Sequence, residues 1–376
     1  MMLHDTAVVG AGVIGGVIAL ELARAGQNVA LIDRGLICRA ASGVNAGTLT
    51  MQMTRVALIP FALRAHAMWA RAPEWLGHDV GVVVCDGLSV AFTDAEAELL
   101  ADRAAKRRAA GAPIELIDGR RAQEIEPGLS GKVKLAGHCR VDGYANAYLT
   151  GLAFRRALTA AGVALMENRP VEGATTCPGG YELATPDGPV RVRRVVLAGG
   201  AWLERMAGWF DVRLPIKCLV NQLAVTERLR PVMRTVLGVA SGLLSLKQYP
   251  HGTVVIGGGW QGIGDSVTGP REIVPENLLG NIRLACHAVP ELARSRIARA
   301  WLGLEAETAD ALPAVGALPG MPDIQVCGSV HSGYTSGPFV AKLVADQLLG
   351  REPELSLAPF DVARLIEGQT TQGSAR

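Results

Sequence analysis

A glycine-rich turn close to the N-terminus constrains the fold of this chain more than any other sequence feature. The turn, GAGVIG at residues 10–15, follows an apolar, β-branched run at Thr6–Val9 and precedes apolar residues at helical spacing over Val13–Ala25. A second apolar run follows at Asn28–Ile32. This order predicts a β-turn-α-β unit, and the continuous apolar runs are typical of parallel strands that are buried on both faces.

Three glycines and one acidic residue in this unit predict a dinucleotide site. Gly10 allows a tight turn, Gly12 lets the backbone approach a pyrophosphate, and Gly15 lets the helix pack closely on the strand. The N-terminus of the helix offers free N–H groups and the positive end of the helix dipole to phosphate. Asp33, at the end of the second strand, can accept hydrogen bonds from ribose hydroxyls and would repel a 2′-phosphate, which disfavours NADP.

Length, composition and charge limit the classes of protein to which this chain can belong. The chain has 376 residues, which allows two domains or one large α/β domain, and its 49% apolar and 19% charged residues are ordinary for a globular protein. A net charge of +2 gives no indication of a nucleic-acid partner. The 7 cysteines are scattered and form no CxxC pair, so we expect no metal site and no disulfide scaffold, and a cytoplasmic location.

The apolar N-terminal run does not resemble a targeting segment. It covers 15 residues, Thr6–Leu20, but no basic region precedes it, it contains four glycines, and Glu21 and Arg24 follow it directly. No window of the chain reaches the roughly 18 uninterrupted apolar residues of a membrane-spanning helix. We therefore expect neither a signal peptide nor a membrane span.

The alternation of segment types predicts a discontinuous two-domain organisation. The α/β segments occupy both ends and the middle of the sequence, and β-rich segments lie between them. We expect an α/β fold (α+β overall) with a Rossmann-like nucleotide-binding domain at residues 1–80, 140–213 and 305–376. A substrate or cap domain, built on a mixed or antiparallel sheet, is expected at residues 81–139 and 214–304.

Local patterns add three expectations that can be checked in a structure. Asp86-Gly87 is a hairpin signal between strands expected at Val80–Val84 and Leu88–Phe92. The last helix is expected from about Gly337 to Leu349, because a glycine-rich loop precedes it. The polar tail after Glu367 is expected to be disordered.

Three further loops of small residues favour a flavin over a nicotinamide as the dinucleotide. The loop at Ser42–Gly47 carries a hydroxyl and an amide, which suit close passage along a pyrophosphate and a flavin ring. A second loop, Leu197–Trp202, follows a buried strand. A third, Gly328–Pro338, opens a helix whose N-terminus can stabilise negative charge on a reduced flavin.

With these loops in place, the sequence resembles the FAD-dependent D-amino-acid oxidase, glycine oxidase and sarcosine oxidase family over nearly its whole length. The order and spacing of many short motifs carry the resemblance. The motifs are Gly10–Gly16, Asp33-Arg34, Ser42–Gly47, Glu126-Pro127-Gly128-Leu129, Asp142-Gly143, Ala198–Trp202, Gly257-Gly258, Gly303, Thr308-Ala309-Asp310, Pro313–Gly316 and Gly333–Pro338. The resemblance implies a two-domain flavoprotein in which FAD extends along the first domain and its isoalloxazine faces the sheet of the second.

The family also implies a set of residues that contact FAD. They belong to the glycine turn, the end of the second strand, the small-residue loops and an adenine-side valine expected at the end of a strand. The set is Gly10, Gly12, Val13, Ile14, Gly15, Asp33, Arg34, Ser42, Asn45, Ala46, Gly47, Thr48, Val171, Ala198, Gly199, Trp202, Gly333, Tyr334, Thr335 and Ser336.

Departures from the family pattern narrow the expected activity. Many members read Gly-Leu-Arg where this chain has Gly303-Leu304-Glu305, so the arginine that holds a substrate carboxylate is replaced by an acid. The cysteine that bonds FAD covalently in monomeric sarcosine oxidases is absent, which implies noncovalent FAD. Val254 or Val255 stands in the strand where those enzymes place a lysine that promotes reaction with oxygen, which favours a dehydrogenase.

The variant loop Asn45-Ala46-Gly47 and the missing arginine are most similar to the β-type flavin subunits of heteromeric opine, L-proline and D-hydroxyproline dehydrogenases. This likeness implies a second subunit and an iron–sulfur electron-transfer partner. The substrate would be an amino acid or secondary amine, such as a D-amino acid, an N-alkyl amino acid, proline or hydroxyproline, or an opine.

The reaction of this family removes a hydride from the carbon next to an amine and passes it to flavin N5, which requires orientation more than acid–base machinery. Glu305 is a candidate for binding a cationic or N–H-bearing part of the substrate, or is a surface carboxylate. His331 precedes the expected flavin-binding residues Gly333–Ser336 and is an active-site candidate or a packed loop histidine. Tyr249 and Gln52 are weaker candidates. Arg55 could replace the missing carboxylate anchor, or be a solvated arginine at a helix start.

Three alternatives stay open at this point. An FAD-dependent 2-hydroxy-acid dehydrogenase would need a histidine base near N5, for which His331 is the candidate. A flavin subunit could relay electrons only, with the substrate site on a partner. An NAD-linked dehydrogenase would use the same glycine turn.

Overall fold

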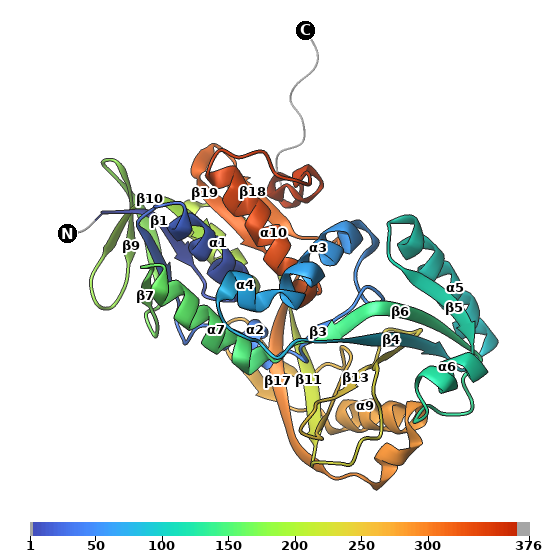
Figure 1. Ribbon diagram of the computed structural model, residues 1–376. Coiled ribbons are helices and arrows are strands. Elements are labelled where there is room, and N and C mark those ends of the chain that lie inside the picture. The colour runs from blue at the N-terminus through green and yellow to red at the C-terminus, as the bar shows by residue number, and fades with distance from the viewer. Residues whose placement is uncertain (1–2, 367–376) are drawn as a thin grey trace.

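The computed structural model describes residues 3–366 and contains two large sheets, each covered by helices (Figure 1). The first sheet is 8-stranded, and its main path is parallel except at one edge. Its path is β18 (Ala314–Leu318), β19 (Met321–Gly328), β10 (Val190–Leu197), β1 (Leu3–Val9), β2 (Val29–Ile32) and β7 (Ala164–Met166), and β9 (Gly180–Ala184) and β8 (Gly173–Cys177) extend it from β10.

Helices cover this sheet because its strands are apolar on both sides. Strand β1 pairs in parallel with β2 and β10, and Val8, Leu31 and Val196 face a cluster with four helices. These helices are α1 (Val13–Arg24), α3 (Ile59–Ala70), α7 (Ala147–Ala160) and α10 (Gly333–Leu348). Close packing needs Gly16, where an added Cβ would lie 2.8 Å from the ring of Phe154. The predicted β-turn-α-β unit is confirmed.

The second sheet is 9-stranded and mostly antiparallel, and β12 and β4 are its parallel pair. Its path is β17 (Ile297–Glu307), β11 (Lys217–Thr226), β14 (Val254–Gly257), β13 (Ser245–Gln248), β12 (Val236–Val239), β4 (Val83–Ala91), β6 (Leu135–Tyr144) and β3 (Thr48–Leu49), and β5 (Ile114–Asp118) pairs with β6. A separate hairpin joins β15 (Ile263–Asp265) to β16 (Gly269–Glu272). The mixed α/β fold expected from the sequence is confirmed.

The two faces of the second sheet differ in character. Leu237, Leu246 and Ile256 pack into a core with helix α9 (Pro275–Ala288). The register places Lys247 opposite Val255 on the other face, because directly paired antiparallel residues point the same way.

The remaining helices are α2 (Ala41–Val44), α4 (Ala72–Leu76), α5 (Asp94–Ala109), α6 (Gly119–Ile125) and α8 (Leu203–Ala207).

Ends of the second sheet reach the first one. Val220, Leu304 and Ala306 belong to the same buried cluster as Ala7 and Ile32 of the first sheet. At the N-terminal side of β17, the Trp301 indole donates to the carbonyl of Val44 (2.8 Å). The C-terminal end of helix α2 is therefore held against the second sheet.

Three local expectations have different outcomes. The hairpin expected at Asp86-Gly87 is wrong, because β4 continues through it with a register shift between Cys85 and Gly87. Gly87 lets the Asp142 side chain of β6 lie directly against the backbone of β4, since an added Cβ at Gly87 would lie 2.0 Å from the Asp142 carboxylate. The last helix begins at Gly333, four residues before the expected start, with Pro338 in its first turns. The tail after Glu367 lies outside the described residues.

The division into two domains stays a proposal. It agrees with the presence of two sheets, but its boundaries cross strands. Strand β3 at Thr48–Leu49 pairs with β6 in the second sheet although it belongs to the segment 1–80. Strand β6 spans the boundary at 139–140, and β17 spans the boundary at 304–305.

Three further structural findings concern residues 3–366. No helix there combines the length and apolar character needed to cross a membrane. No group of three His, Cys, Asp or Glu side chains in that part of the chain is arranged to hold a metal ion. Each of the cysteines is a free thiol, as at the buried positions Cys38, Cys139 and Cys327.

Candidate active site

The turn between β1 and α1 is built by close backbone approaches that only glycine permits. Gly10 has φ +112°, and an added Cβ would lie 2.4 Å from the carbonyl of Ala198. An added Cβ at Gly15 would lie 1.9 Å from the Gly10 carbonyl. Gly12 caps α1 without a side-chain hydrogen bond, so the helix N-terminus is left for an anion.

Two side chains line this turn in positions that suit a dinucleotide. The Ser42 hydroxyl accepts from the Val13 N–H (3.0 Å). The Asp33 carboxylate accepts from the N–H groups of Ala11 (2.7 Å) and Gly35 (2.8 Å), and it keeps lone pairs for ribose hydroxyls. An added Cβ at Gly12 would enter the space beside Ser42, 3.1 Å from its hydroxyl. The cradle therefore fits a pyrophosphate and a ribose.

We call residues 45–48 the flavin loop, and the loop is fixed from several sides. The Asn45 amide donates to the carbonyls of Ala41 and Ser42, and its oxygen accepts from the Gly47 N–H (2.7 Å). Gly47 has φ +74°, and an added Cβ would lie 2.2 Å from the Ala145 carbonyl. A rigid loop of small residues leaves its backbone free to approach a flat ring.

The other expected FAD contacts before α10 lie in three places. Arg34 stacks over the Trp202 ring, 4.9 Å from its centroid, and the Trp202 indole donates to the Ser266 carbonyl (2.6 Å) in the β15–β16 turn. Ala198 and Gly199 follow β10 beside the glycine turn. Val171 lies in the loop between β7 and β8, not at the end of a strand as expected.

The start of α10 lies against the flavin loop. Ser332 has φ +58° and caps the helix, and the Thr335 hydroxyl donates to the Thr48 carbonyl (3.1 Å). Tyr334 points away into the core, where it stacks on Trp69 and shares a hydrogen bond with Thr150 (2.7 Å). Only the backbone of Tyr334 is therefore available to a cofactor.

Polar side chains gather on β11 and β17, on the face of the second sheet that carries Val255. Asn221 donates to the Glu305 carboxylate (2.6 Å) and accepts from the Gln261 amide (2.5 Å). Gln261 also accepts from the Val220 N–H (2.9 Å), which fixes its orientation. Glu305 is thus held by an ordered amide pair and keeps its second oxygen for a ligand.

His331 and Arg55 complete this cluster. His331 Nδ1 is buried without a well-aligned hydrogen bond and lies 3.5 Å from Glu305 and 4.0 Å from Glu307. Arg55 lies 4.0 Å from Glu307, and its Nε is buried without a partner. Burial lowers the pKa of His331, whereas the two carboxylates act in the opposite direction. The cluster therefore offers an acid, a neutral imidazole and a partly unsatisfied cation.

Tyr249 and Gln52 lie apart from this cluster. The Tyr249 phenol donates to the carbonyls of Ala46 (3.2 Å) and Ala145 (3.1 Å), and burial raises its pKa. Gln52 is buried next to Gly137 on β6. Their contacts favour support of the flavin loop and of β6 over substrate binding.

Sequence reasoning missed Asn221, Gln261 and Lys247. Lys247 is 0% exposed on β13, one strand away from the expected lysine position and directly opposite Val255. A polar residue in the middle of an apolar strand was the available signal at Asn221 and Lys247. Gln261 gave no comparable signal because it lies in a glycine-rich connection.

The contacts of Asp142 account for the motif Asp142-Gly143. Its carboxylate is buried and accepts from the Thr50 hydroxyl (2.6 Å) and the Met51 N–H (2.8 Å). It thus ties the segment after β3 to β6. Burial raises the pKa of Asp142 to about 6, although these hydrogen bonds act in the opposite direction.

This raised pKa predicts a pH-dependent stability. A carboxyl whose pKa is higher in the folded state favours folding at low pH, and the contribution is lost as pH rises from about 4 to about 6. Chemical denaturation of the wild type and Asp142→Asn at pH 4 to 7 measures it. The wild-type free energy of unfolding should fall relative to the variant by at most about 3 kcal/mol over this range, then stay constant. If the unfolding free energies of the wild type and Asp142→Asn change with pH in parallel, the prediction is wrong.

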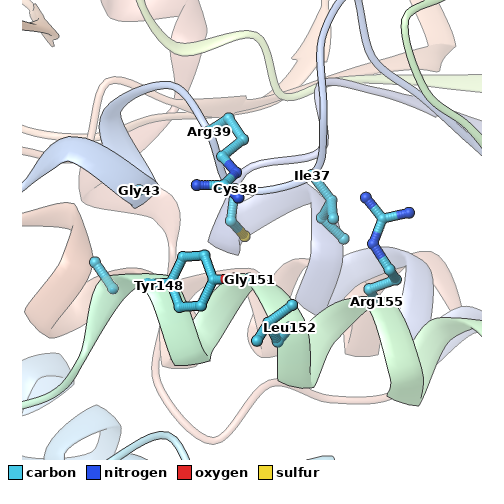
Figure 2. A pocket seen from close by; sticks show the side chains of 9 residues that line it. Ile37, Cys38, Arg39, Gly43, Tyr148, Gly151, Leu152 and Arg155 are labelled. Atoms are coloured by element: carbon cyan, nitrogen blue, oxygen red, sulfur yellow. The ribbon is translucent and has the colours of Figure 1, made fainter.

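A small surface pocket lies between the segment after β2 and helix α7 (Figure 2). Cys38, Tyr148 and Leu152 line it together with two arginines. Arg39 stacks over the Tyr148 ring at 5.1 Å, and Arg155 pairs with Glu167. The lining includes neither Glu305 nor His331, so this pocket is not the candidate substrate site.

The glycine turn, the flavin loop and the start of α10 come together beside the second sheet, which defines a dinucleotide-dependent oxidoreductase of the flavoprotein class. The chain belongs to the FAD dependent oxidoreductase family, whose model matches residues 5–347. FAD is therefore its cofactor.

The chain is also similar to individual relatives over nearly its full length. It is 28% identical to the glycine oxidase of Geobacillus kaustophilus, covering 96% of this chain and 97% of that one. It is 28% identical to one of the subunits of the opine oxidase of Rhizobium meliloti, with 96% and 97% covered. The crystal structure of the Geobacillus kaustophilus glycine oxidase matches with a TM-score of 0.89 at 27% identity, covering 97% and 99% of the two chains.

Proposed function

We propose that this protein oxidises the C–N bond of an amino acid or secondary amine. The substrate is a D-amino acid, an N-alkyl amino acid, proline or hydroxyproline, or an opine. When noncovalently bound, FAD supplies the hydride acceptor, its N5 atom. The chain contributes binding, orientation and exclusion of water, in a cytoplasmic setting.

The presence of Glu305 and the Arg55 cation in one cluster supports this proposal most directly. Glu305 is oriented by Asn221, and Arg55 carries an unsatisfied buried Nε in the same cluster. A zwitterionic amino acid has a cationic nitrogen and an anionic carboxylate, and both charges find partners here. Arg55 thus takes the role of the arginine that Glu305 replaces in the family pattern.

His331 acts as the proton acceptor. Burial lowers its pKa, so the ring starts unprotonated, and the carboxylates of Glu305 and Glu307 stabilise the imidazolium that forms when it takes a proton from a substrate ammonium. Hydride removal requires the neutral amine, so this transfer would prepare the substrate. The reactive C–H bond is then oriented by the contacts to Glu305 and Arg55.

Electron transfer to a carrier other than oxygen is part of the proposal. Val254 and Val255 are both buried and apolar, and by the resemblance one of them stands where monomeric sarcosine oxidases place an oxygen-promoting lysine. The similarity to one subunit of an opine oxidase supports a second subunit, and an iron–sulfur protein would be its electron-transfer partner. The protein would then act as the flavin subunit of a heteromeric dehydrogenase.

The test is an absorbance spectrum followed by anaerobic addition of amino acids, N-methyl amino acids, prolines and opines. A yellow protein that one secondary amine or amino acid bleaches supports the proposal, and reoxidation by a dye but not by oxygen supports a dehydrogenase. If no amine bleaches the flavin, the amine-oxidising function of the isolated chain is refuted, and electron relay for a partner protein is then the better account. Acid precipitation that releases the yellow colour shows noncovalent FAD.

One observation favours a second candidate, a 2-hydroxy-acid dehydrogenase. A neutral His331 next to a carboxylate is also the arrangement of a base that takes a proton from an alcohol. Bleaching by a 2-hydroxy acid, and its loss in His331→Ala with an unchanged flavin spectrum, would favour this candidate over amine oxidation.

A further inference from the structure

Lys247 occupies an unusual position for a lysine. It lies on β13 near the middle of the second sheet, is 0% exposed, and is among the largest fully buried side chains of the described residues. Burial of an ammonium group in a protein interior is costly, and only hydrogen bonds or opposite charges that the group meets there offset the cost. The position therefore requires an explanation that packing alone does not supply.

The contacts of Lys247 all lead to the flavin loop or to one serine beside it. The ammonium donates to the Ala46 carbonyl (2.9 Å), the Thr48 hydroxyl (2.5 Å) and the Ser245 hydroxyl (3.3 Å). The two hydroxyls also share a hydrogen bond (2.8 Å). All three donors of the side chain thus have acceptors, and two of these belong to residues about 200 positions earlier in the sequence.

Thr48 connects the Lys247 contact to the start of α10. Its hydroxyl meets Lys247, and its carbonyl accepts from Thr335 in the first turn of α10. The Tyr249 phenol donates to the same Ala46 carbonyl as Lys247. The loop is therefore held between the start of α10 on one side and β13 on the other.

The charge of Lys247 has few neighbours to neutralise it. The titratable group that acts on it is Cys85 on β4, which in turn interacts with Asp142 and Tyr144 on β6, and Tyr249 donates to the same Ala46 carbonyl. Burial lowers the pKa of Lys247 to about 7, and Cys85 acts weakly in the opposite direction. Lys247 thus changes charge near neutral pH, next to the loop.

We propose that Lys247 is a positioning residue that clamps the flavin loop to the second sheet and lends its positive charge to the bound flavin. A cation at this place stabilises the negative charge that a flavin gains on reduction. The inference rests on the proposed assignment of residues 45–48 to the flavin. It deepens that assignment, because it adds a contact from the second sheet and a positive charge, which residues 45–48 do not carry.

Two variants separate the hydrogen bonds of Lys247 to the flavin loop from its positive charge. Lys247→Met removes both, and Lys247→Gln keeps a donor without the charge. Tyr249→Phe is the matched control, because it removes a hydrogen bond to the same Ala46 carbonyl without changing charge. The measurements are the melting temperature of the apoprotein, the dissociation constant for FAD, and the midpoint potential of the bound flavin from pH 6 to 9, all without substrate.

We expect Lys247→Met to bind FAD about tenfold more weakly and to lack the inflection near neutral pH that the wild-type potential shows. Lys247→Gln should recover much of the affinity but not the inflection. Unchanged affinity and potential in both variants, or a Tyr249→Phe variant that reproduces both effects, would overturn the inference. If Lys247→Met does not fold, the FAD affinity of Lys247→Gln and the pH dependence of the wild-type midpoint potential test the inference instead. A wild-type potential without an inflection near neutral pH would overturn the inference.

Failure of this inference can be told apart from failure of the proposed function. If the wild-type flavin is reduced by an amine but the Lys247 variants behave as wild type, only the role of Lys247 is lost. If no amine reduces the flavin, FAD affinity and potential still report on Lys247. A wild-type chain that does not bind FAD would refute both.

Discussion

Gly12→Val should yield a folded protein that no longer holds FAD. Gly12 has an extended backbone, with φ −72° and ψ −178°, so a side chain brings no backbone strain. An added Cβ meets only the Ser42 hydroxyl, at 3.1 Å. The rest of the valine would fill the space at the N-terminus of α1 where a pyrophosphate must lie. We expect FAD affinity to fall about 100-fold, which corresponds to roughly 3 kcal/mol.

Titration of the apoprotein with FAD, followed by flavin fluorescence, measures this loss, and circular dichroism reports on folding. Gly173→Val at the start of β8 is a suitable control, because nothing lies within 4 Å of an added Cβ there. The control should bind FAD as the wild type does. Full FAD binding by Gly12→Val would show that the cofactor does not approach this glycine.

Glu305→Gln should keep its flavin and lose most of its activity on a cationic substrate. The substitution preserves the shape of the side chain and its contact with Asn221, but removes the negative charge. A charge-assisted hydrogen bond in a partly buried site contributes about 1.5–3 kcal/mol. We expect kcat/KM to fall about 100-fold, with the visible spectrum and the melting temperature close to those of the wild type.

Anaerobic stopped-flow reduction of the flavin separates binding from the chemical step. Glu272→Gln is the matched control, because Glu272 is an exposed acid on β16 outside the cluster. It should reduce at the wild-type rate. Glu305→Gln that reduces within twofold of the wild type would place the substrate elsewhere, and the electron-relay account would gain.

Much of the cofactor-binding half could be predicted from local sequence. Gly15 is required by its distance to the Gly10 carbonyl within the same turn, and the spacing to Asp33 follows from the length of one helix and one strand. Such constraints act between residues close in sequence, so a pattern can reveal them. The same local reasoning placed α1 to within one residue at each end.

Local reasoning was wrong where a distant partner decided the conformation. Asp86-Gly87 has the composition of a turn, yet β4 continues through it because the Asp142 side chain from β6 occupies the space beside Gly87. The start of α10 was placed too late because its first residues are glycine and small polar residues. Contacts with the flavin loop, such as Thr335 to Thr48, stabilise that first turn.

Sequence motifs and the family they resemble predicted the class of cofactor, and they revealed an acid where many members of that family have an arginine. Only the tertiary structure decided which side chains meet around that acid. Glu305, Asn221 and His331 come from two strands and a loop, and Lys247 reaches Ala46 across about 200 residues of chain. Pairing of strands sets these distances, and strand pairing depends on contacts distant in sequence that no local pattern contains.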